Sequence, residues 1–257
     1  MMEVKRIVCH FSCGAASAVA TKLAIEKNKV GANLPLEIIY CHVRREHPDN
    51  LRFLKDCETW FGVPIQVLED KKYNADPFEV AWRNRFIKSK DGAPCTKHLK
   101  KALGKAFARF GDLDVFGFTA QEQGRLDRMI DANADMLVDA PLIDGNLDKG
   151  ACLAILERTG IELPVLYRMG YDHNNCIGCL KAGAWYWNKV RVDFPETFQE
   201  AMKLEAYVGH PILRINKKPV FLKDLAPGRG RKHEEPNIEC GVACEMAEGN
   251  IYAAGLL

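Results

Sequence analysis

Two cysteine pairs offer the clearest chemistry in this sequence. Cys176 and Cys179 form a Cys-x2-Cys pair, and Cys240 and Cys244 form a Cys-x3-Cys pair later in the chain. A tight turn over the first spacing can aim both thiolates at one metal ion. Because four soft thiolates select zinc or an iron–sulfur cluster, the two pairs together predict a metal site. The alternative is that they are small apolar packing residues, but the flanking stretches NNCIGC and IECGVAC are polar.

A second candidate site is the small-residue turn Ser12-Cys13-Gly14-Ala15-Ala16-Ser17, which follows an apolar run. Backbone N–H groups at the start of a helix bind phosphate or sulfate through hydrogen bonds and the helix dipole. Ser12 and Ser17 can add hydroxyl donors. The alternative is a plain strand-to-helix turn in which Ser12 caps the helix. Cys13 is equally open: the dipole can activate its thiol, or it is simply small enough to fit the turn.

Short apolar runs alternate with helical patterns over the first two-thirds of the chain. Because strands separated by helices form βαβ units, the alternation predicts an α/β fold, a Rossmann-like parallel sheet with flanking helices. Such sheets bind ligands at the carboxyl ends of their strands, which makes the turn after the first strand a prime position. We expect strands at 6–11, 36–43, 64–68, 113–118 and 135–140, and helices over 96–111 and from about residue 195.

The pattern changes after about residue 165, where the chain becomes rich in aromatic residues and cysteine. This predicts a Rossmann-like nucleotide-binding domain over residues 1–165 and a small, cysteine-rich, helical metal-binding extension over residues 166–257. The cluster Trp185, Tyr186 and Trp187 could stack on bases or pack the extension against the sheet.

Composition excludes several classes of protein. Thirty-six Lys and Arg against 34 Asp and Glu leave a net charge of +2, so no global field favours nucleic acid or a membrane. No apolar run approaches the ~20 residues that span a bilayer, and no signal-peptide pattern is present. We therefore expect a cytoplasmic protein without a membrane partner. In that reducing compartment, paired cysteines indicate metal or redox chemistry. Four others lie in strand or helix patterns and are expected in the core: Cys9, Cys41, Cys57 and Cys152.

The loop at residues 12–17 resembles the PP-loop of the adenine nucleotide alpha-hydrolase-like superfamily, whose pattern is Ser-Gly-Gly-x-Asp-Ser. Three further stretches resemble the phosphoadenosine phosphosulfate (PAPS) reductase branch. They are PCTKHLKKAL (94–103), GFTAQEQGR (117–125) and the segment 141–179 that ends in Cys-x-x-Cys. In the second, Gly117, Glu122 and Arg125 match the branch pattern, and Thr119 replaces its first arginine. The stretch from 176 to 198 is similar to PAPS-reductase-like proteins of bacteriophages.

The resemblance implies an enzyme that binds an adenine nucleotide (PAPS, APS or ATP) and acts in sulfur transfer or sulfonucleotide reduction. It implies a nucleotide site made by the loop Ser12, Cys13, Gly14, Ala15, Ala16 and Ser17 together with Lys97, Glu122 and Arg125. Arginine suits this role because its fixed donors bind phosphate in a bidentate way.

The resemblance also assigns roles to cysteines. Glu239-Cys240-Gly241 resembles the sulfonucleotide reductase ending Glu-Cys-Gly-Leu-His, whose cysteine attacks the sulfate sulfur before a thioredoxin-like reductant resolves the product. Cys95 and Cys240 are therefore the catalytic candidates. An iron–sulfur cluster, or alternatively zinc, would be held by Cys176, Cys179, Cys240 and Cys244, or by a set in which Cys95 replaces Cys240.

Two other functions stay open at this point. One is an ATP-dependent enzyme that modifies nucleic acid, of the thiolation type found among related PP-loop proteins. The other is a non-catalytic protein that senses a nucleotide or binds a partner. The sequence predicts no particular oligomeric state.

Overall fold

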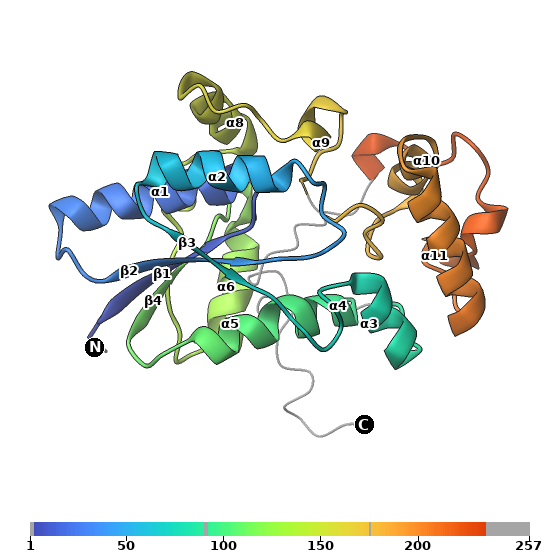
Figure 1. Cartoon of the computed structure of the whole chain (residues 1–257), viewed down its shortest axis with the longest axis horizontal. Coiled ribbons are helices and arrows are strands. Elements are labelled where there is room, and N and C mark those ends of the chain that lie inside the picture. The colour runs from blue at the N-terminus through green and yellow to red at the C-terminus, as the bar shows by residue number, and fades with distance from the viewer. Residues whose placement is uncertain (1–2, 90–91, 175, 235–257) are drawn as a thin grey trace.

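The central sheet has five parallel strands in the order β3-β2-β1-β4-β5 (Figure 1). The computed structural model describes residues 3–89, 92–174 and 176–234. The middle strand, β1, is buried at nearly every position because helices cover both faces of the sheet. This confirms the predicted α/β fold with a Rossmann-like parallel sheet. The strands are β1 (Arg6–Phe11), β2 (Leu36–Cys41), β3 (Ile65–Leu68), β4 (Asp112–Val115) and β5 (Leu137–Asp139).

Helices lie on both faces of the sheet (Figure 1). One face is covered by α1 (Ala15–Val30) and α2 (Asn50–Phe61), with α8 (Lys149–Arg158) packed beside α1. The other face is covered by α5 (Ala102–Phe107) and α6 (Gln123–Ala132), whose side chains surround a smaller cluster. The inner strands are therefore protected from water on both faces, whereas the edge strand β3 leaves Gln66 and Val67 exposed.

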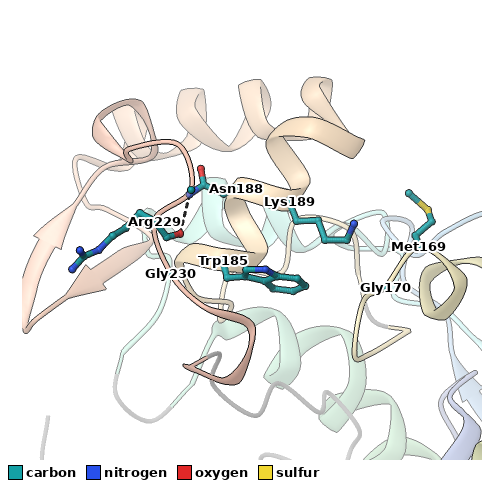
Figure 2. Close-up of a pocket in the computed structure, with 8 residues that line it drawn as sticks. Met169, Gly170, Trp185, Asn188, Lys189, Arg229 and Gly230 are labelled. Carbon is teal, nitrogen blue, oxygen red and sulfur yellow. Dashed lines mark hydrogen bonds between the residues drawn. The ribbon is translucent and has the colours of Figure 1, made fainter.

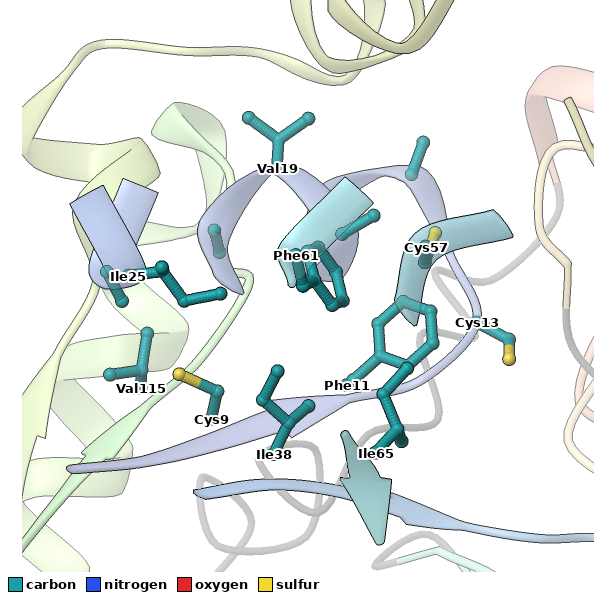
Figure 3. Close-up of a cluster of buried hydrophobic side chains, with 14 of the residues drawn as sticks. Cys9, Phe11, Cys13, Val19, Ile25, Ile38, Cys57, Phe61, Ile65 and Val115 are labelled. Atoms are coloured by element: carbon teal, nitrogen blue, oxygen red, sulfur yellow. The ribbon is translucent and has the colours of Figure 1, made fainter. Parts of the chain in front are cut away.

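The largest hydrophobic cluster lies between the sheet and α1 and α2 (Figure 3). Phe11 of β1 contacts Phe61 of α2 edge-on, with ring centroids 5.7 Å apart. Ile25 of α1 packs into the same cluster. The four cysteines that the sequence places in the core are all buried: Cys9, Cys41, Cys57 and Cys152.

A second hydrophobic cluster joins the C-terminal part of the chain to α3 (Pro77–Asn84). It includes Tyr186 and Trp187, which confirms the packing interpretation for these two aromatics. Their partners are α3 and α11 instead of the sheet; Trp187, for example, meets Phe198. This part contains α10 (Ala184–Asp193), α11 (Pro195–Val208) and an antiparallel hairpin of β6 (Leu213–Ile215) and β7 (Lys218–Val220).

Short elements connect these layers. The helix expected over 96–111 is present with other bounds: α4 (Pro94–Thr96), a π-helical turn (Lys97–Lys101) and α5 follow one another without interruption and end four residues before Gly111. The remaining short helices are η2 (Ala120–Glu122), α7 (Pro141–Asp144), α9 (Val165–Arg168), η3 (Leu222–Asp224) and η4 (Lys232–Glu234). In the part of the chain that the structure describes, no helix combines the length and apolar character needed to cross a membrane.

Candidate functional site

The strand order reverses between β1 and β4. The chain runs outward from β1 through β2 to β3 and then returns to β4 on the other side of β1. The loops after β1 and β4 therefore border the position where α/β sheets bind ligands. They meet at Gly117, where a Cβ atom would lie 2.7 Å from the Cα and backbone N of Ser17. Only glycine fits this approach, which presses the second loop against the first turn of α1.

The loop between β1 and α1 is closed by its two serines. The Ser17 hydroxyl accepts hydrogen bonds from the Ser12 N–H and the Ser12 hydroxyl, each at 3.0 Å, and donates to the Gly14 carbonyl at 3.0 Å. Gly14, and not Ser12, is the N-cap residue of α1. The interpretation of Ser12 as a helix cap is therefore wrong, because its hydroxyl is used to shape the loop.

Cys13 takes a left-handed backbone conformation, with φ of 55°. Its thiol is fully buried in the main cluster, and this burial raises its pKa well above the ordinary value, with the Glu46 carboxylate adding to the effect. This burial favours the other interpretation, in which Cys13 is simply small enough to fit the turn. Its backbone contributes instead: the Cys13 carbonyl accepts a hydrogen bond from Asn174 Nδ2 at 2.7 Å.

Basic and aromatic groups lie beside the first turn of α1. The Ala15 N–H donates to the Tyr167 hydroxyl at 3.4 Å, and Lys149 Nζ lies 5.8 Å from the centre of the Tyr167 ring. Lys149 Nζ is also 3.2 Å from His173 Nδ1. Burial and the Lys149 charge lower the pKa of His173 to about 4, so its imidazole is neutral at pH 7. The lysine charge and the helix dipole together favour an anion at this point.

Arg125 and Glu122 border the same group of side chains, since both charges act on His173. The two residues form an ion pair, and Arg125 also lies over the Phe118 ring at 5.4 Å. Glu122 closes a capping box with Thr119, whose N–H donates to Glu122 Oε2 at 3.0 Å. Glu122 therefore fixes the loop after β4 and holds the guanidinium of Arg125 in place.

Three predicted cysteines meet in one small pocket. Cys95, Cys176 and Cys179 line it, and Lys100 and Lys181 contribute the positive charges. Cys179 is buried, and the other two are partly buried against the cluster around Leu99. The pocket therefore brings together three of the five cysteines proposed as metal ligands or nucleophile.

The Cys-x-x-Cys turn is built by Tyr186 and Gly178. The Tyr186 hydroxyl donates to the Cys176 carbonyl at 2.7 Å and accepts from the N–H groups of Gly178 and Cys179 at 3.1 and 3.4 Å. Gly178 has φ of +78°, and a Cβ atom there would lie 2.6 Å from Thr197 Cγ2. The spacing of the two cysteines is therefore held in a buried, hydrogen-bonded turn.

The donor chemistry of this pocket fits a soft metal, because three cysteines face it. Within the described residues, however, no group of three or more His, Cys, Asp or Glu side chains is arranged to hold a metal ion. Cys240 and Cys244, which the sequence proposes as further ligands, lie outside the described residues. The catalytic role predicted for Cys240 therefore stays a prediction.

Two lysines of the π-helical turn differ in their exposure to solvent. Lys97, predicted to bind nucleotide, is exposed, whereas Lys100 is buried with its Nζ 3.8 Å from Glu46 Oε1. Glu46 also accepts hydrogen bonds from the Tyr40 hydroxyl and from Asn50 Nδ2. Burial raises the pKa of the Glu46 carboxyl above its ordinary value. A buried polar network therefore lies between the loop and the cysteine pocket.

Asn174 connects the two halves of the site. Its Nδ2 donates to the Cys13 carbonyl and to Asn50 Oδ1, both at 2.7 Å, and Cys176 follows two residues later. Sequence reasoning gave no role to Asn174 itself, and only the general resemblance of the segment 141–179 pointed to that region. Asn50, Lys149 and His173 were likewise given no role. Tyr186 was considered for stacking or packing, but not for holding the Cys-x-x-Cys turn.

A separate cavity of about 510 Å³ lies in the C-terminal part (Figure 2). Trp185, the remaining aromatic of the predicted cluster, lies along it with Lys189 and Met169. Asn188 closes one side by donating to the carbonyls of Ala226 and Arg229. This cavity shares no lining residue with the cysteine pocket.

No protein-family model matches the chain, and no curated protein matches it.

Proposed function

We propose that this chain is an adenine-nucleotide-binding enzyme that acts in sulfur transfer or sulfonucleotide reduction. The observation that carries the proposal is the link through Asn174 between an anion-favouring loop at the strand-order reversal and a pocket lined by three cysteines. A nucleotide loop alone would suit many activities. A cysteine pocket beside it supports chemistry at sulfur.

Each part has a role in this proposal. The N–H groups at the start of α1 bind phosphate or sulfate, in a loop shaped by Ser12 and Ser17. Arg125 and Lys149 balance the charge of a PAPS, APS or ATP molecule. The neutral His173 keeps the site from carrying a further charge.

The cysteine pocket serves the sulfur chemistry. Cys176, Cys179 and Cys244, together with either Cys240 or Cys95, would hold an iron–sulfur cluster, or alternatively zinc. Bound there, a cluster would supply a redox-capable centre, and zinc would supply a structural one.

In sulfonucleotide reduction, the thiolate of whichever of Cys95 and Cys240 is not a metal ligand attacks the sulfate sulfur. The bond between sulfur and the nucleotide phosphate oxygen breaks, and a thiosulfonate forms. A thioredoxin-like dithiol then releases sulfite and is oxidised to a disulfide.

Nucleotide affinity tests the loop assignment directly. Calorimetric titration of the protein with ATP, APS and PAPS should give saturable binding of at least one of them. Lys149→Gln or Arg125→Gln should weaken it about 10-fold or more, the value of one charge-assisted hydrogen bond. Lys29→Gln, an exposed lysine in the last turn of α1, is the matched control. Absence of binding to all three nucleotides, or unchanged affinity in both variants, would remove the assignment.

Metal and sulfide content tests the cysteine pocket. Anaerobically purified protein should contain iron with acid-labile sulfide, or zinc, and Cys176→Ser should lose it. Cys57→Ala, in the main core, should retain it. Sulfite release from APS or PAPS with a dithiol reductant supports the reductase form of the proposal. ATP turnover that needs RNA or DNA would replace it with nucleic-acid modification, and nucleotide binding without turnover would replace it with a sensor.

A further inference from the structure

An exposed aromatic stack joins α3 to α11 on the surface. The rings of Trp82 and Tyr207 lie parallel, with centroids 3.8 Å apart and planes 3° apart. Arg85 extends the stack, because its guanidinium carbon lies 5.2 Å from the Tyr207 ring centre and its Nε donates to the Tyr207 hydroxyl at 3.3 Å. Trp82 and Tyr207 are 41% and 40% exposed, and Phe86, just beyond α3, is 44% exposed.

One face of this stack is open. Among the described residues, no ring or cation other than Tyr207 contacts the Trp82 indole. Arg83, next to Trp82, donates from its Nε to Glu79 Oε1 at 2.6 Å. Arg85 therefore supplies the positive charge beside the stack. Lys203 lies one turn before Tyr207 on α11 and is exposed. The surface thus offers a flat aromatic platform with a guanidinium and an ammonium beside it.

Charge is distributed unevenly over the chain. Residues 77–87 and 184–234, which contribute to the second hydrophobic cluster, hold 12 Lys and Arg against 7 Asp and Glu. The whole chain holds 36 against 34, so all other residues hold 24 against 27. The net charge of +2 therefore hides a basic part of the molecule, and the aromatic stack lies within it.

We infer that this surface, made by Trp82, Arg85, Phe86, Lys203 and Tyr207, binds single-stranded nucleic acid. Bases stack on exposed aromatic rings while basic side chains track the phosphates, and both features occur together here. A duplex is not favoured, because its bases present no free ring face to Trp82. A protein partner is less favoured, since nothing on this surface selects one beyond its charge.

The surface is close to the cysteine pocket. Pro77, the first residue of α3, lines that pocket, and Trp82 follows five residues later, about 7.5 Å along the helix axis. A strand held on Trp82 would reach the neighbourhood of the cysteines. The inference does not require the nucleotide loop to function, because none of its residues belongs to that loop.

Fluorescence anisotropy of labelled 20-nucleotide oligo(U) and oligo(dT), with a 20-base-pair duplex as comparison, tests the inference on the full chain. We expect both single strands, or one of them, to bind more tightly than the duplex and to weaken as salt rises. Trp82→Ala should weaken binding about 10-fold or more, whereas Trp82→Phe, which keeps a ring, should stay within about 3-fold.

Matched controls separate binding from folding. Phe110→Ala removes another exposed aromatic, 77% exposed, and should change nothing. Arg85→Gln should weaken binding, whereas Arg158→Gln on α8 should not. Circular dichroism and nucleotide affinity at the loop should be unchanged in all of them. Equal binding of duplex and single strand, or full affinity in Trp82→Ala, overturns the inference. Preference for RNA over DNA, or the reverse, identifies which single strand is bound.

Discussion

Replacement of His173 gives the sharpest test of the electrostatics at the proposed nucleotide site. In an unfolded chain the imidazole titrates near pH 6.5, whereas burial and Lys149 lower its pKa to about 4 in the folded protein. Between these values the unfolded chain binds more protons, so the folded state loses stability as pH falls. From pH 7.5 to pH 5.5 the loss due to His173 is roughly 1 kcal/mol, and it grows to roughly 2.5 kcal/mol at pH 4.5.

Urea unfolding at pH 7.5 and pH 5.5 measures this loss. His173→Gln cannot titrate, so its free energy of unfolding should fall about 1 kcal/mol less than that of the wild-type protein over the same interval. His210→Gln, at an exposed histidine, should behave like the wild type. If His173→Gln and the wild type lose the same stability, the neutral imidazole beside Lys149 is refuted.

The same residue reports on the ligand. A bound anionic nucleotide would favour the charged imidazole, so binding would take up a proton. Nucleotide affinity in the wild type should then rise between pH 7.5 and pH 5.5, by at most about 10-fold if the pKa returns fully to 6.5. His173→Gln should show no such rise. A wild-type affinity that is independent of pH would mean that the nucleotide binds away from His173.

Two further substitutions test how the site is built. Tyr186→Phe removes the hydroxyl that holds three backbone groups of the Cys-x-x-Cys turn, and should lower the free energy of unfolding by about 2 kcal/mol. Tyr207→Phe is the control. A change below about 0.5 kcal/mol for Tyr186→Phe in urea unfolding would contradict this role. Gly117→Ala forces a Cβ atom against the backbone of Ser17 and should cost about 1–3 kcal/mol and weaken nucleotide binding. At Gly124, on α6, no backbone atom lies near the Cβ position, so Gly124→Ala should be tolerated. Similar losses of stability in the two variants would show that the close approach of Gly117 to the Ser17 backbone does not matter.

The sheet could be predicted from sequence because strands buried on both faces are continuous apolar runs. Residues 6–11 coincide with β1, and residues 36–43 and 64–68 contain β2 and β3. The order of the strands is not contained in any local pattern, yet it decides where the loops after β1 and β4 meet. The two loops meet at Gly117. This position must be glycine because the backbone of Ser17, far away in the sequence, leaves no space for a Cβ atom.

The site was predictable where one short segment carries the chemistry. The turn at residues 12–17 and the pair Cys176 and Cys179 were found because their spacing has a local meaning. The behaviour of Cys13 was not, since its thiol contacts the Asn50 carbonyl and the Glu46 charge raises its pKa, and both partners come from a later part of the chain. Lys100 lies in the stretch PCTKHLKKAL without being singled out there, and its burial beside Glu46 is visible only in the folded chain.

The net charge of the whole chain does not describe its surface region by region. A net charge of +2 predicts no attraction to nucleic acid only if the charges are mixed evenly over the surface. Residues 209–234, which contain the β6–β7 hairpin, hold seven Lys and Arg against two Asp and Glu, whereas α11 holds one Lys against three Glu. Folding brings residues 77–87 next to residues 184–234, which no charge count along the sequence anticipates. The same contact places α3 between the cysteine pocket and the exposed aromatic stack, so one helix relates the proposed chemistry to the proposed nucleic-acid surface.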